Sequence, residues 1–282
     1  MAEITAQMVK TLRDKTAAGM ADCKKALVEA EGDMDKAIEI LRKKGAASAA
    51  KRADRSAQEG IVAALLAEDK KKGIIIEINC ETDFVAKNED FVAYVNTVAK
   101  AYLENEAADI DALMNVKVGN DSVADLHNSI LAKFSEKIEV RRMQKVVTNG
   151  FLSAYNHFDK KLGVLVEANI ATPDDKTKTA VHDIALQVAA MNPVSVDRSN
   201  VSQAKIDKEI EIYKEIAINE GKAPEMAEKV AQGKLNKFFQ ESCLLEQVFA
   251  KDNTKKVSEV LIDANADLKI VAFTRYALGE EI

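Results

Sequence analysis

The stretch "GIVAALLAEDKKKGIIIEINCET" (residues 60–82) returns in altered form 90 residues further along the chain, as "GFLSAYNHFDKKLGVLVEANIAT" (residues 150–172). Aligned without a gap, residues 60–100 and 150–190 are identical at 11 of 41 positions and share an Asp-Lys-Lys-x-Gly segment. Each copy has an apolar run, a polar segment with glycine and a second apolar run, which is the pattern of a β-hairpin. A helical pattern follows each hairpin. The repeat therefore predicts a duplicated core of antiparallel three-stranded sheets with helices.

Each copy ends in the same way, with a further helix and a third strand. In the first copy these are residues 122–136 and 137–147, and in the second they are residues 255–266 and 267–277. The second copy is interrupted by residues 192–250, where two helical segments flank Gly221 and Pro224. This interruption predicts an inserted antiparallel helical arm. Its apolar stripe is narrow, as in a coiled coil, and consists of Ile206, Ile210, Tyr213 and either Ile216 or Ala217.

Three short helices are predicted in residues 5–44, and helices this short bury their apolar faces only against one another. Thr5 and Asp33 are placed to cap the first and third helices, and we expect the third to stop at Gly45. Residues 46–59 lack apolar periodicity and are interpreted as a linker or a loosely packed helix. The predicted fold class is α+β, divided into an N-terminal three-helix module (1–45), a linker (46–59), a first core subdomain (60–149), a second core subdomain (150–191 and 251–282) and the inserted arm (192–250).

The composition favours a cytoplasmic protein. The chain has 282 residues, with 46 acidic and 40 basic side chains and a net charge of −6, which argues against direct binding to nucleic acid. The first residues, "MAEITAQMVKTLRDK", lack the uninterrupted apolar run of a signal peptide, and no run approaches the roughly 18 apolar residues of a membrane span. Three widely spaced cysteines suit a reducing compartment better than a disulfide framework. We therefore expect no membrane contact.

An enzyme is a poor interpretation of this sequence. The histidines at positions 127, 157 and 182 lie in separate elements without the spacing of metal ligands, and neither a Gly-rich phosphate loop nor a GxSxG or CxxC motif is present. Cys80 could be imagined as a nucleophile, but no nearby histidine would activate it, and a buried structural thiol is the better interpretation. The matching position in the second copy is Ile170. We expect no covalent chemistry, no cofactor and no metal.

The segment after the first hairpin differs between the copies. The first copy continues from the shared Thr82 into Asp83-Phe84-Val85, whereas the second continues into Pro173-Asp174-Asp175. A turn in this place therefore does not require an aromatic side chain. One interpretation is that Asp83 caps a helical turn and Phe84 staples it to the core. The other is a protruding probe, an acid and an aromatic aimed at a partner, and the difference between the copies favours the probe.

Two stretches resemble the signatures of a known family. "LRDKTAAGMADCKKAL" (12–27), with Ala17 where that family usually has Gly, and "EINCETDFVAK" (77–87) are similar to the bacterial elongation factor Ts family, the guanine-nucleotide exchange factors of elongation factor Tu. The resemblance runs over nearly the whole chain and implies an N-terminal module of the ubiquitin-associated (UBA) type. It further implies that residues 82–85 (Thr82, Asp83, Phe84 and Val85) reach the Mg²⁺ side of the GTPase. Phe84 would wedge behind the nucleotide site, and Asp83 would disturb the Mg²⁺ and phosphate environment.

The resemblance also implies contacts outside this segment. Arg13, Met20 and Lys24 match positions that grip the nucleotide domain of elongation factor Tu; the alternative is a solvated helix face for the two cations and a core position for Met20. His157 matches a residue that contacts another domain of the GTPase, or it is an inert turn residue. The arm at 202–240 is interpreted as a dimerisation or docking element, the alternative being a self-contained hairpin.

The end of the chain differs from some members of that family, and two other functions are compatible with parts of the sequence. Some members continue into a further C-terminal helical module, whereas we expect none after "LGEEI" (278–282), so affinity or docking geometry should differ. A ubiquitin-associated-like module with an unrelated core would bind ubiquitin-like partners and be indifferent to changes at Asp83. An enzyme working through Cys80 and Glu81 would turn over a small substrate and be sensitive to Cys80→Ser.

Overall fold

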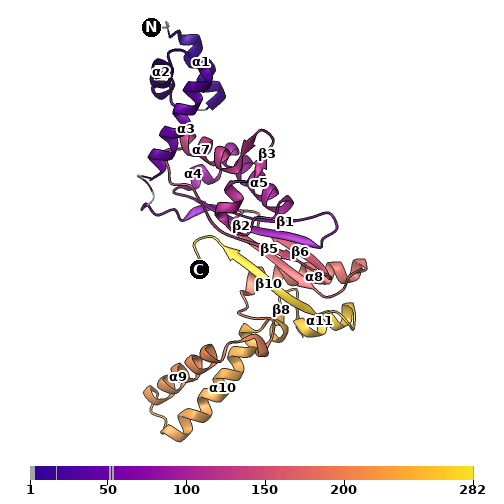
Figure 1. The fold of residues 1–282 in the computed structure, drawn as a ribbon. Helices are drawn as coiled ribbons and strands as arrows, with labels where there is room; N and C mark the ends of the chain where they lie inside the picture. Colours follow the sequence, from indigo (N-terminus) through magenta and orange to yellow (C-terminus); the bar gives the residue numbers. More distant parts are fainter. Residues whose placement is uncertain (1–3, 17, 51, 53, 282) are drawn as a thin grey trace.

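Two three-stranded antiparallel sheets form the centre of the molecule, with a three-helix bundle at one end and a helical arm at the other (Figure 1). The computed structural model describes residues 4–16, 18–50, 52 and 54–281. The predicted mixture of helices and antiparallel sheets is confirmed. The division of the chain into separate domains stays a prediction. In the described part of the chain, no helix has both the length and the apolar character needed to cross a membrane.

Each copy of the repeat folds as the predicted hairpin plus a third strand. The first sheet has the order β1-β2-β5 and consists of β1 (Glu59–Leu66), β2 (Lys72–Cys80) and β5 (Glu139–Val147). The second has the order β10-β7-β6 and consists of β6 (Phe151–Asn156), β7 (Leu162–Ala168) and β10 (Ile270–Ala277). Two small ribbons join β3 (Lys117–Val118) to β4 (Asp121–Ser122) and β8 (Val248–Phe249) to β9 (Asp252–Lys256).

Helices cover the outer face of each sheet. The first sheet carries α5 (Glu89–Glu104), α6 (Ile110–Met114) and α7 (Val123–Lys133), and the second carries α8 (Asp175–Met191) and α11 (Val257–Ala264). Side chains alternate between the two faces of a strand, so Ile74, Ile76 and Ile78 of β2 pack under the helices while Ile75 faces the other sheet. The result is four layers, helix, sheet, sheet and helix, which explains why β2 is buried on both faces from Gly73 to Cys80.

The turns of the two hairpins join the sheets in a reciprocal way. Val62 of β1 donates its backbone N–H to the carbonyl of Lys160 at 2.8 Å, and Leu152 of β6 donates to Lys70 at 2.8 Å. Residues 62 and 152 correspond in the repeat, as do residues 70 and 160, so the two bonds are related by a pseudo-twofold axis. The shared Asp-Lys-Lys-x-Gly segment therefore holds each copy against the other.

Two glycines of the repeat allow the sheets to approach closely. A Cβ at Gly73 would lie 3.0 Å from Cδ1 of Leu152, and a Cβ at Gly163 would lie 2.9 Å from Cγ1 of Val62. Both separations are shorter than ordinary van der Waals contact. The two positions correspond in the repeat, and so do their two neighbours. Glycine is thus required here because the other copy occupies the space.

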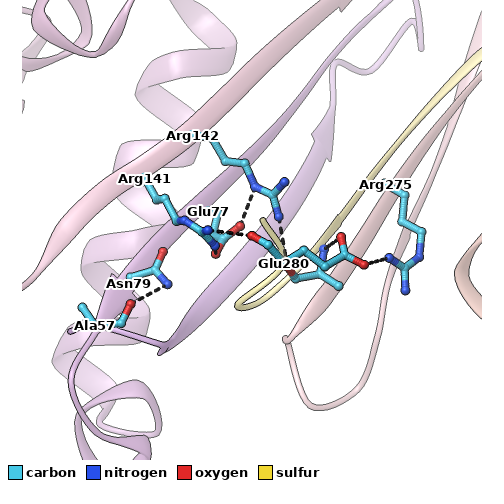
Figure 2. Close-up of polar contacts among 8 residues, drawn as sticks. Ala57, Glu77, Asn79, Arg141, Arg142, Arg275 and Glu280 are labelled. Atoms are coloured by element: carbon cyan, nitrogen blue, oxygen red, sulfur yellow. Dashed lines mark hydrogen bonds and ion pairs between the residues drawn. The ribbon is translucent and has the colours of Figure 1, made fainter. Parts of the chain in front are cut away.

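A buried carboxylate ties the second half of the core to the first (Figure 2). Glu77 of β2 is fully buried and accepts hydrogen bonds from Arg141 at 3.0 Å and Arg142 at 2.6 Å, both on β5. Arg142 also donates to the carbonyl of Ala277 at 2.9 Å, and Arg141 donates to the carbonyl of Glu280 at 2.6 Å. A buried charge must be paired, and these contacts fix the last residue of β10 and the chain just beyond it on the first sheet.

Three helices form the N-terminal bundle: α1 (Ala6–Thr16), α2 (Met20–Glu29) and α3 (Met34–Ala50). The Thr5 side chain caps α1 at the backbone N–H of Met8 (3.2 Å), and Asp33 caps α3, as predicted. The expectation that α3 stops at Gly45 is wrong, because the helix continues to Ala50. A glycine inside a helix costs only about 1 kcal/mol relative to alanine and does not break it. Arg42 of α3 holds the bundle to the core by contacts with Asp121 and Asp125.

The predicted arm is a pair of helices that projects away from the sheets (Figure 1). It consists of α9 (Gln203–Asn219) and α10 (Pro224–Ser242), with short 3₁₀ turns at Arg198–Asn200 and Leu244–Glu246. Ile206 and Ile210 pack against Leu235 and Phe239, as the stripe predicts. Of the two alternatives for its last member, Ala217 is buried and Ile216 is exposed. That the pair forms a coiled coil stays a prediction.

His127 of α7 is partly buried, and its Nδ1 atom lies 2.7 Å from the hydroxyl of Tyr94 on α5. Burial lowers the pKa of this imidazole from 6.5 to about 4, so it is neutral in the folded protein. The unfolded chain binds the extra proton below pH 6.5. The proton binding of the unfolded chain therefore leaves the free energy of unfolding unchanged above that pH and lowers it as pH falls towards 4. We expect the unfolding free energy of the wild type to fall by up to about 1.4 kcal/mol per pH unit in this window, relative to His127→Gln, in urea titrations.

We expect Gly163→Ala to lower the free energy of unfolding by about 1–3 kcal/mol, because the new methyl group would collide with a branched side chain of the other sheet. Equilibrium denaturation followed by circular dichroism measures this change. The matched control is Gly233→Ala in α10, where nothing lies within 4 Å and helix propensity predicts a gain of about 1 kcal/mol. Equal stability of the two variants would contradict the close approach of the sheets.

Candidate functional site

The first hairpin ends in a short helix that only this copy of the repeat has. Strand β2 stops at Cys80, and α4 (Asp83–Ala86) begins three residues later. The hydroxyl of Thr82 accepts the backbone N–H of Val85 at 3.4 Å and so caps the helix. Asn88 then caps the following helix α5 by accepting the N–H of Asp90 at 3.0 Å. The chain therefore starts two successive helices, each with its own cap, and these caps fix the backbone of residues 82–88.

Glu136, which the sequence pattern did not single out, holds the entry to this helix. Its carboxylate accepts the backbone N–H groups of Glu81 at 3.1 Å and Thr82 at 3.0 Å, and the hydroxyl of Thr82 at 2.6 Å. Bonds to an ionised acceptor are stronger than neutral ones, so a single side chain orients the start of α4. Glu136 lies 54 residues away in sequence, just before β5, and no local pattern connects it to Thr82.

Phe84 and Val85 point in opposite directions. Val85 is 7% exposed and lies in the core between the first sheet and its helices, whereas Phe84 is 83% exposed. The interpretation in which Phe84 staples the turn to the core is therefore wrong. The side chain that packs the turn against the core is Val85. An isolated phenylalanine this exposed gains nothing from burial in the free protein, so the fold itself does not require an aromatic side chain here.

Asp83 forms an ion pair across one turn of the same helix. Its Oδ2 atom lies 2.7 Å from Nζ of Lys87, and this hydrogen bond holds the pKa of the carboxyl below its usual value. Both side chains are largely solvated, and exposed pairs of this kind contribute little to stability. Separating Asp83 from Lys87 therefore costs little free energy.

The hairpin turn of the second copy lies beside α4. A cavity of about 330 Å³ separates them, with Asp83 and Lys87 on one side and Phe158 and Lys161 on the other. His157 belongs to this turn, where its Nδ1 atom lies 2.7 Å from the hydroxyl of Tyr155. The fold thus brings Phe158 and Lys161 of this turn near Asp83, although more than 70 residues separate them in sequence. His157 itself lines a different cavity, together with Leu186 and Phe249.

The three other candidates lie on a separate part of the surface. Arg13, Met20 and Lys24 are exposed on α1 and α2, in the bundle at the far end of α3 (Figure 1). Met20 is 49% exposed, so its interpretation as a core residue is wrong. The structure places these side chains on one small bundle and not within the α4 site.

Cys80 does not have the properties of a nucleophile. Its side chain is fully buried, and burial raises the pKa of the thiol to about 12, so it is protonated at neutral pH. Its Sγ atom donates to the carbonyl of Thr82 at 3.2 Å, a structural contact under α4. Within the ranges that the structure describes, no cluster of three or more His, Cys, Asp or Glu side chains could hold a metal ion.

Known proteins resemble this chain over its full length. A family model described as Elongation factor TS matches residues 81–280. The chain is 44% identical over 290 aligned residues to "Elongation factor Ts" of Chloroherpeton thalassium, covering 100% of both chains. It is 45% identical over 288 residues to that of Chlorobaculum tepidum (99% of this chain, 100% of the relative) and 43% over 287 to that of Clostridium tetani (99% and 94%). Similarity of this extent makes the chain a translation elongation factor, a protein of protein biosynthesis. Within that class it belongs to the elongation factor Ts family.

We expect Glu136→Ala to loosen the entry to α4 without unfolding the core. Loss of a charged acceptor of three hydrogen bonds removes roughly 1.5–3 kcal/mol of local stabilisation, so backbone amides of residues 81–86 should exchange with deuterium at least about tenfold faster. Amides of β2 should stay protected. Glu106→Ala, which removes an exposed carboxylate 3.6 Å from Lys145, is the control and should leave residues 81–86 unchanged. Equal exchange in both variants would contradict the role of Glu136.

Proposed function

We propose that this protein binds elongation factor Tu carrying GDP and promotes release of the GDP, so that GTP can replace it. The observation that carries the proposal is Phe84, an exposed aromatic side chain on a short helix that is capped, anchored and absent from the second copy of the repeat. Membership of the elongation factor Ts family supports the choice of partner. The protein performs no covalent chemistry and acts in the cytoplasm.

Exchange of this kind follows from differential binding. A factor that binds the nucleotide-free GTPase more tightly than the GDP-bound form must, by linkage, weaken GDP by the same factor. Phe84 acts as a wedge, since phenylalanine is large, has few rotatable bonds and loses little entropy on docking. Val85, buried beneath it, and Glu136 at the helix entry keep the wedge in place as it meets the partner.

Asp83 acts on the Mg²⁺ and phosphate environment of the GTPase. Mg²⁺ requires near-octahedral oxygen coordination and is sensitive to a carboxylate brought near its ligands. In the free protein this carboxylate is paired with Lys87 at 2.7 Å in an exposed position. Such a pair is separated at little cost, so the carboxylate can change partners as the complex forms. Thr82 contributes as the cap that directs both side chains outward.

The rest of the chain supplies further contacts in this proposal. The bundle of α1 to α3 is of the ubiquitin-associated type and grips the nucleotide domain of elongation factor Tu through Arg13, Met20 and Lys24, all of them exposed. His157 contacts a second domain of the GTPase. The arm of α9 and α10 serves dimerisation or docking, and nucleic acid takes no direct part. The N-terminal bundle, the two core subdomains and the arm act as separate domains in these contacts.

We expect Phe84→Ala and Asp83→Ala each to reduce the exchange activity at least about tenfold, because each removes a group that acts on the nucleotide site. The measurement is release of a fluorescent GDP analogue from elongation factor Tu, with and without this protein. Neither variant should change the thermal melt, since Phe84 is exposed and the ion pair of Asp83 is solvated.

The control variant is Val147→Ala, which removes a 69% exposed apolar side chain at the opposite end of the first sheet and should keep full activity. A folded wild type that fails to accelerate release, tested with the GTPase of the same organism, would overturn the proposed function. Activity lost together with a collapsed melt would mean that the two side chains support the fold.

A further inference from the structure

Phe158, like Phe84, is an exposed aromatic side chain that has no aromatic counterpart in the other copy of the repeat. It is 87% exposed, and together the two phenylalanines are the most exposed large apolar side chains in the described residues. In the first copy, the position that corresponds to Phe158 is Glu68, and in the second copy the position that corresponds to Phe84 is Asp174. Each copy therefore has one exposed aromatic side chain where the other has an acid.

The turn that carries Phe158 does not need an aromatic side chain to fold. In the first copy Lys70 has a φ of 55°, and in the second Lys160 has a φ of 60°. In both turns the aspartate side chain accepts the N–H of the residue two positions later, at 2.9 Å in the first copy and 3.0 Å in the second. The same turn is thus built with Ala-Glu in one copy and His-Phe in the other.

The two departures meet on one side of the pseudo-twofold axis. The cavity of about 330 Å³ has Phe158 on one wall and residues of α4, among them Asp83, on the other. On the other side of the axis the turn of the first copy approaches the segment before α8, where Lys71 donates to the carbonyl of Ala171 at 2.8 Å. That side carries Glu68 and Asp174 at the two positions where Phe158 and Phe84 would otherwise correspond.

The turn around Phe158 is held firmly. Lys160 accepts the backbone N–H of Val62, and Lys161 forms an ion pair with Glu59 at 2.7 Å. The ring of Phe158 also contacts that of His157, with centroids 4.5 Å apart. An aromatic side chain that is exposed on a preorganised turn loses little entropy when a partner covers it, which is the character of a binding anchor.

We propose that Phe158 is a second aromatic anchor for the same GTPase partner, and that α4 and the turn at 157–161 form one docking surface across the cavity. The inference rests on the proposed function and deepens it. Phe84 acts on the nucleotide site, whereas Phe158 lies on the far wall of the cavity and holds the partner. The partner would present an apolar contact to each ring, separated by a polar segment that faces the ion pairs Asp83–Lys87 and Glu59–Lys161.

The test is a titration of the rate of GDP release against the concentration of this protein, with elongation factor Tu carrying a fluorescent GDP analogue. We expect Phe158→Ala to raise the half-saturating concentration at least about tenfold while the maximal rate stays within about twofold of the wild type. Phe84→Ala should instead lower the maximal rate. Phe158→Tyr should retain most of the wild-type affinity, because it keeps the ring.

Two further variants make the test specific. Phe158→Glu introduces the residue that the first copy has in the same turn, so the fold tolerates it, and it should weaken binding at least as much as Phe158→Ala. Glu68→Ala, at the matching exposed position of the other turn, should behave as the wild type. Thermal melts of all variants should coincide.

The outcomes separate the two proposals. Acceleration by the wild type with an unchanged half-saturating concentration in Phe158→Ala and Phe158→Glu would overturn the anchor and leave the proposed function standing. A loss of maximal rate alone would also overturn it, because Phe158 would then act on the nucleotide site. No acceleration by the wild type would overturn the proposed function, and the anchor with it.

Discussion

Two backbone hydrogen bonds, one in each direction, join the copies of the repeat: Val62 to Lys160 and Leu152 to Lys70. They form only if the two sheets lie face to face at a single relative position. That position brings Gly73 and Gly163 against the side chains of the opposite sheet and leaves no room for a Cβ atom. Because the bonds are reciprocal, a shift that improved one would break the other. The positions of α4, the turn at 157–161 and the end of the chain all follow from this constraint.

Because the two copies share one fold, exposed positions at which their residues differ indicate where the copies have different roles. Thr82 is shared by both copies, whereas Phe84 and Phe158 each belong to one. The shared fold places Phe158 and the helix that carries Phe84 on the same side of the axis, at one cavity. Packing does not demand either ring, since the other copy folds without it. The comparison of two halves of one chain thus gives an internal measure of which exposed residues the fold requires.

Much of this architecture could be predicted from the sequence because it depends on local periodicity. The hairpins, the closing strands and the helices of the arm each have a period that is visible in their own residues. The direction of Phe84 could not be predicted in this way, because a helix of four residues is too short to show a period. Glu136 and the turn at 157–161 reach α4 only through tertiary packing, and no local pattern encodes such contacts. Helix α3 continues beyond Gly45 because one unfavourable residue does not outweigh the helix around it.

The two ends of the inserted arm lie side by side. Val194 donates its N–H to the carbonyl of Ser242 at 2.8 Å, Leu244 donates to Ser195 at 2.9 Å, and Ser195 and Cys243 form a β-bridge. The chain therefore leaves the core and returns to it at almost the same point, and the core is continuous across the interruption. An insertion of this kind can be lengthened, shortened or lost in evolution without a change in the path of the strands on either side. The length of the arm and the docking of the two sheets are therefore structurally independent of each other.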